Sequence, residues 1–142
     1  MSIPLPTGRA DRHIAFLGVL HQLWAAFHGL IGLALGFFAV SAALVASSPD
    51  RRPGAEIAAA VTAAGFAVFA AAALAWSLVH AWCGRALLRH QPAARLLALA
   101  LALLNVLLFP LGTLLAGYTA WALLQDDVRA RFVERSPASI HH

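Results

Sequence analysis

The sequence predicts an all-α fold, a bundle of four transmembrane helices with the N- and C-termini in the cytoplasm. Of its 142 residues, 61% are hydrophobic and only 11% are charged, whereas a soluble domain carries about 25% charged residues. A soluble domain of this length buries only about two thirds of its chain surface. The second observation is that charged residues are absent from three long apolar runs. Together these observations make the lipid bilayer the solvent for most of the chain.

The first helix is predicted over residues 14–46. This run has no charged residue and would form a helix of about 50 Å, longer than a hydrocarbon core of about 30 Å. We therefore expect it to tilt, to project beyond the bilayer or to break. Residues 47–54 are rich in proline, glycine and aspartate, which predicts a surface turn.

The second helix is predicted over residues 56–82, where alanine dominates. The segment from Cys83 to Arg95 contains three arginines, a glycine and a proline, so it is predicted to be a polar loop. Pro92 suits the first turn of the next helix, where its missing N–H is not needed.

The third and fourth helices are predicted over residues 93–109 and 112–132. Pro110 and Gly112 predict a reversal between them, and Thr113 is predicted to cap the fourth helix. Each apolar half is about 23 Å long. The turn therefore reaches the far surface, or it lies within the bilayer where only protein contacts satisfy its backbone. Residues 1–135 are predicted to form a single transmembrane domain, and residues 136–142 a disordered tail.

The arginines support four spans. Cytoplasmic loops of membrane proteins carry an excess of positive charge. Three spans would place five arginines on each side, whereas four spans divide them eight to two. The eight on the cytoplasmic side are Arg9, Arg12, Arg85, Arg89, Arg95, Arg129, Arg131 and Arg135, and the outer two are Arg51 and Arg52.

Residues 94–127 carry a motif in which an arginine-led apolar helix runs into Pro-x-Gly-Thr and then into Tyr-x-x-Trp-x-Leu-Leu. The segment resembles a recurring pattern of small uncharacterised bacterial four-helix integral membrane proteins, and residues 17–36 are similar to their glycine-rich opening helix. The resemblance implies a four-helix membrane fold and no activity. The matching positions are Arg95, Pro110, Gly112, Thr113, Tyr118, Trp121, Leu123 and Leu124.

Three histidines within the predicted spans are candidate cofactor ligands. His21 and His28 share one face of the first helix, about 10 Å apart. His80 lies near the inner end of the second helix, where it could meet His21. Facing imidazoles can hold a haem, and a single histidine can ligate the magnesium of a (bacterio)chlorophyll. A purely structural role is favoured, in which each histidine hydrogen-bonds across a helix interface. No cofactor and no metal is therefore expected.

Small residues predict close helix packing. Ala25, Gly29, Gly32 and Gly36 form a stripe on the first helix, and small residues let helix backbones approach in lipid. Asn105, midway along the third helix, is predicted to hydrogen-bond across helices. So much flat surface also predicts contacts with other subunits.

The sequence lacks known enzyme signatures, and its three apolar runs, residues 14–46, 57–82 and 96–124, contain no aspartate, glutamate or arginine. Its arginines form no continuous basic stripe, which argues against nucleic acid. We therefore expect a non-enzymatic accessory subunit of the bacterial cytoplasmic (inner) membrane, packing against a larger complex such as an energy-transducing one. Its partners would be lipids and other membrane subunits or further copies of itself. The alternatives are a haem- or (bacterio)chlorophyll-binding subunit, and a homo-oligomeric pore or lipid-interacting protein.

Overall fold

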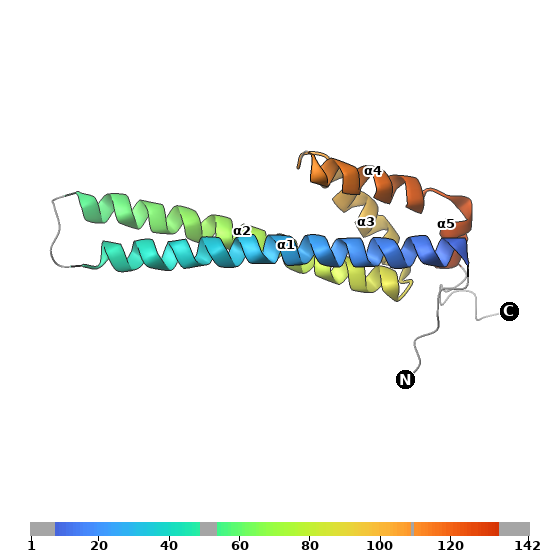
Figure 1. The fold of residues 1–142 in the computed structure, drawn as a ribbon, viewed down its shortest axis with the longest axis horizontal. Coiled ribbons are helices and arrows are strands. Elements are labelled where there is room, and N and C mark those ends of the chain that lie inside the picture. Colours follow the sequence, from blue (N-terminus) through green and yellow to red (C-terminus); the bar gives the residue numbers. More distant parts are fainter. Residues whose placement is uncertain (1–7, 49–53, 109, 134–142) are drawn as a thin grey trace, which may run out of the picture. The chain divides into compact units, whose positions relative to one another are not determined.

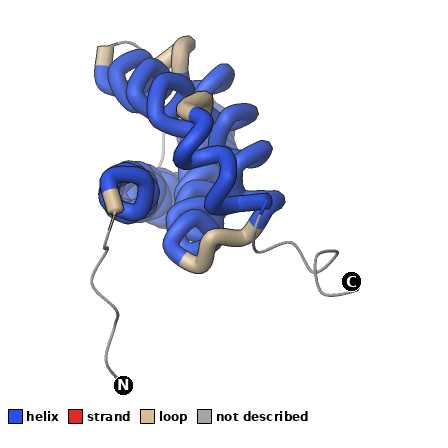
Figure 2. Tube along the Cα trace, turned by 90° about the vertical axis from the view of Figure 1, so that its right-hand side faces the viewer, coloured by secondary structure: helices blue, strands red, loops and turns tan. Residues whose placement is uncertain are grey.

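The computed structural model describes residues 8–48, 54–108 and 110–133. Within these ranges the chain is helical with short turns and no strand (Figures 1 and 2), so the predicted all-α class is confirmed. The predicted tail of residues 136–142, and residues 49–53 of the predicted surface turn, lie outside the described ranges. The helices are α1 (Arg9–Ala46), α2 (Ala55–Leu88), α3 (Pro92–Asn105), α4 (Leu111–Leu123) and α5 (Asp126–Val133).

The contacts divide the chain into two compact units, and both long helices contribute to each. Unit 1 comprises residues 1–23 and 80–142, and unit 2 comprises residues 24–79. Among the described helices, α1 and α2 are long and apolar enough to cross a membrane, while α3 and α4 are shorter apolar helices.

Helix α1 begins at Arg9, five residues before the predicted start. Its buried positions Ala10, Ile14, Leu17 and His21 recur at the helical spacing of three and four residues. Arg9 and Arg12 point to the exposed side. The buried stripe therefore extends the helix through the charged segment.

Helix α2 runs on to Leu88, so the predicted loop from Cys83 was wrong over its first half. His80, Cys83, Gly84 and Leu87 are all buried and form one helical face, while Arg85 is exposed on the other side. The arginines of this segment led to the prediction of a loop, although the residues between them form a buried helical face.

The second helix ends in a Schellman motif, in which a left-handed residue closes the last turn. His90 adopts φ 55°. Its N–H donates to the carbonyl of Leu87 at 2.9 Å, and the N–H of Gln91 donates to Ala86 at 3.0 Å. Pro92 opens α3, as predicted.

Helices α3 and α4 form an antiparallel hairpin, as the Pro110–Gly112 signal predicted. The contact between Gly112 and the Asn105 carbonyl leaves no room for a Cβ. Thr113 does not cap α4, because its hydroxyl donates to the carbonyl of Val106 at 3.0 Å. The N–H of Leu108 donates to Asn105 at 3.0 Å. The turn thus satisfies several of its own backbone groups.

The predicted fourth helix is broken near Leu124, where α4 ends and α5 begins two residues later. Arg95 donates from Nε to the carbonyl of Leu123 at 3.1 Å, so a cation satisfies the end of α4. The break allows Val128 and Phe132 of α5 to be buried in unit 1.

In unit 2, the remaining parts of α1 and α2 pack as an antiparallel pair. A Cβ on Gly32 would lie 2.7 Å from Cγ of Leu74, and a Cβ on Gly29 would lie 3.2 Å from Oγ of Ser77. Ser77 donates to the carbonyl of buried Ala25 at 2.7 Å. Three of the four stripe residues therefore pack within the chain. Gly36 differs, since a Cβ there would meet nothing within 4 Å.

In unit 1, α1 and α2 approach closely at Gly18 and Gly84. A Cβ on Gly84 would lie 2.7 Å from the carbonyl oxygen of Gly18. We expect Gly84→Ala to lower stability by about 1–3 kcal/mol, measured by unfolding in detergent micelles. Gly117→Ala is the control, because a Cβ there meets open space and alanine favours helix by about 1 kcal/mol. Equal stability of the two variants would contradict the close approach.

Candidate functional site

Four polar side chains are fully buried among the described residues, and all four belong to unit 1. They are His21 of α1, His80 of α2, Asn105 of α3 and Thr119 of α4. Burying a polar group in apolar surroundings is costly unless it is hydrogen-bonded. Such residues in a membrane protein are functional candidates by default.

The two buried histidines are in direct contact, as the sequence suggested they could be. Nδ1 of His21 lies 2.9 Å from Nδ1 of His80, and the rings stack with centroids 5.0 Å apart at 24°. Because one nitrogen must donate and the other accept, the two imidazoles take complementary tautomers.

Asn105 extends this pair to α3. Its amide nitrogen lies 3.5 Å from Nε2 of His80, so the predicted hydrogen bond across helices is present. With the amide donating, His80 carries its proton on Nδ1 and donates to His21, whose own proton is then on Nε2. We call these three side chains the histidine chain.

The histidine chain ends at an atom without a partner. Nε2 of His21 has no hydrogen-bond partner among the described residues, and neither has the hydroxyl of Thr119. Thr119 was not predicted, because a lone threonine in an apolar helix gives no sequence signal of burial.

A further polar side chain holds α1 to α2 beside the histidine chain. Nε2 of Gln22 donates to the carbonyl of Ala81 at 2.8 Å. It lies one residue after His21 in α1 and its acceptor one residue after His80 in α2. The close approach of Gly18 and Gly84 brings the two helices within reach of such bonds.

The geometry of the histidine pair does not suit a haem between the rings. A ring nitrogen bonds a metal at about 2.0 Å, so two axial imidazoles hold their nitrogens about 4 Å apart. The observed distance is 2.9 Å. Among the described residues, no group of three histidine, cysteine, aspartate or glutamate side chains could hold a metal ion.

His28, the third candidate ligand, lies in unit 2. Its Nδ1 lies 3.0 Å from the carbonyl of Trp24 in the same helix, to which an Nδ1–H donates. The indole of Trp24 meets its ring edge-on at 4.7 Å. Nδ1 of His28 therefore bonds within its own helix and not, as had been expected, across a helix interface.

Three polar contacts near the start of α1 were not predicted from the sequence. Nδ1 of His13 lies 2.9 Å from the hydroxyl of Tyr118. Asp11 lies 3.5 Å from Arg131 and 3.6 Å from His90. The sequence around Asp11 contains no pattern that identifies these partners.

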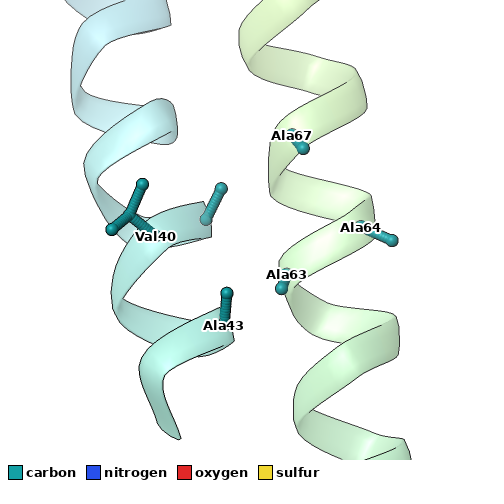
Figure 3. A pocket seen from close by; sticks show the side chains of 6 residues that line it. Val40, Ala43, Ala63, Ala64 and Ala67 are labelled. Carbon is teal, nitrogen blue, oxygen red and sulfur yellow. The ribbon is translucent and has the colours of Figure 1, made fainter. Parts of the chain in front are cut away.

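Unit 2 contains an apolar groove between α1 and α2, with a volume of about 350 Å³. Five of the six lining residues are alanine, and none of the six is charged. Gly36 precedes two lining residues by three and four positions, so it shares their face of α1. The lining residues are Ala39, Val40, Ala43, Ala63, Ala64 and Ala67 (Figure 3).

Comparison with family models, with curated proteins and with solved structures finds no match to this chain.

The hydrogen bond of Asn105 can be tested by Asn105→Leu, which keeps the branching and the number of heavy atoms of the side chain and removes the amide. We expect a loss of about 1 kcal/mol, measured by unfolding in detergent micelles. Ser41→Ala is the control, since this exposed hydroxyl bonds only to a carbonyl of its own helix. An unchanged Asn105→Leu variant would contradict a stabilising histidine chain.

The histidine geometry also predicts an optical result. We expect the protein, purified in mild detergent from its native membrane, to show no absorption band of haem or (bacterio)chlorophyll. A band that is lost in His28→Ala or His80→Ala would show that a histidine ligates a pigment, against this expectation.

Proposed function

We propose that this chain is a non-enzymatic accessory subunit of a bacterial inner-membrane complex, and that it binds a transmembrane helix of a larger partner. The observation that carries the proposal is the apolar groove of unit 2. The proposal assigns no reaction to the chain, since the bonds of the histidine chain join helices to one another.

The groove has the chemistry of a helix-packing surface. In lipid, helices associate through van der Waals contact, and small residues allow their backbones to approach. The groove continues along α2 as a stripe of exposed alanines at helical spacing, namely Ala60, Ala64, Ala67, Ala71 and Ala75. Gly36 and Gly65 add open backbone in unit 2.

In this proposal the chain crosses the membrane four times with both termini in the cytoplasm. Helices α1 and α2 supply two spans, and α3 and α4 supply the others. The internal bonds of the α3–α4 turn support this assignment, because backbone at membrane depth must be satisfied by the protein itself. The division of arginines supports the orientation.

A second copy of the chain is the alternative occupant of the groove. The mass of the native particle distinguishes it from a different partner. The native particle is extracted in mild detergent and its mass and components are determined. A heterogeneous complex is expected. A homo-oligomer would overturn the accessory role and favour a pore or another assembly of identical chains.

We expect Ala64→Leu and Ala67→Leu to release the partner, because an isobutyl group fills the space its helix would occupy. Ala72→Leu is the matched control: it lies on the same helix, is also exposed, and points about 100° away from the stripe. The readout is the amount of partner retained per chain, which should fall at least tenfold only in the groove variants. Equal retention in all three would contradict docking at the groove.

A further inference from the structure

We infer that the histidine chain is an acid-sensitive latch: it holds α1, α2 and α3 together within unit 1 while neutral, and releases them when it takes up a proton. This inference is independent of the groove, which lies in unit 2.

The hydrogen bonds of the chain already use both imidazole lone pairs. Nε2 of His80 accepts from the amide of Asn105, and Nδ1 of His21 accepts from Nδ1–H of His80. A proton added at His21 would place two N–H groups face to face at 2.9 Å. A proton added at His80 would face the amide N–H. Uptake of a proton therefore displaces a hydrogen bond between helices.

Rotation of the Asn105 amide would restore one bond, but the new charge would stay buried. His21, His80 and Asn105 are all 0% exposed. A buried charge is strongly unfavourable unless an opposite charge pairs with it. Protonation of the pair would therefore destabilise the closed arrangement of the helices in either orientation of the amide.

Among the described residues of the surrounding helices, no carboxylate lies where it could pair with that charge. On α1 the nearest acid is Asp11, about 15 Å away along the axis and engaged with Arg131. The acids of α5, Asp126 and Asp127, are exposed. The other titratable or charged groups in the described part of unit 1 are Arg9, Arg12 and His13 on α1, Cys83 and Arg85 on α2, Arg95 on α3, Tyr118 on α4 and Arg129 on α5, with Arg89 and His90 between α2 and α3.

Proton binding couples closure of the helices to pH. The opened state exposes imidazoles that take up protons and the closed state excludes them, so closure weakens as the pH falls. An exposed imidazole is half protonated near pH 6.5. Between pH 8 and pH 5 the equilibrium constant for opening should thus rise about 30-fold for each histidine released.

The test measures the separation of α1 and α3 by electron paramagnetic resonance in lipid nanodiscs. Spin labels are placed at Val19→Cys and Leu103→Cys, which are both exposed, in the full chain carrying Cys83→Ala. We expect a second, longer distance to appear reversibly at pH 5. In His21→Gln/His80→Gln the distances should not respond to pH, because glutamine does not titrate.

His13→Gln and His90→Gln are the controls, since these histidines contact other groups, and both should keep the acid response. If the double variant does not fold, nitrogen NMR of the histidine rings in the unmutated chain reports the protonation of His21 and His80 instead. Protonation of His21 or His80 that coincides with the distance change supports the latch. An acid response that survives in the double variant, or two rings that stay neutral and in contact at pH 5, would overturn it.

Discussion

The two fully buried imidazoles of unit 1, His21 and His80, find hydrogen-bond partners on other helices, and these bonds organise the unit. Gly18 and Gly84 bring the backbones of α1 and α2 so close that a Cβ would collide. At this separation His21 reaches His80, and Gln22 reaches the carbonyl of Ala81. Because these polar bonds are directional, they fix the register of the two helices, which apolar contacts alone would leave free to slide.

The two units solve the packing problem with different side chains. Unit 2 joins α1 to α2 mainly through glycine, alanine and one serine, and this flat surface leaves an apolar groove. Unit 1 adds three shorter helices and buries four polar side chains. Binding of a partner and response to acid would therefore depend on separate sets of residues, so that each can be altered without touching the other.

The sequence predicted the helical class, the α3–α4 reversal and the meeting of His21 with His80, because these follow from hydrophobic runs, Pro-Gly chemistry and helix direction. It failed at the end of α2, where exposed arginines concealed a buried face through Cys83 and Leu87. The break before α5 was also missed, and the bond that Arg95 donates to the end of α4 joins residues 28 positions apart, which no local pattern reveals. Thr119 was missed because burial of a threonine is decided by tertiary packing, which leaves no local pattern.

The shortness of α3 and α4 has a consequence for the surrounding lipid. Helices of 14 and 13 residues are about 20 Å long, against a hydrocarbon core of about 30 Å. Where such a hairpin crosses a membrane, the bilayer beside it thins, at a cost of a fraction of a kcal/mol per Å. A neighbour with equally short spans shares that thinned region and removes part of the cost. Hydrophobic mismatch would thus draw this chain toward thin bilayer regions and toward partners of matching thickness.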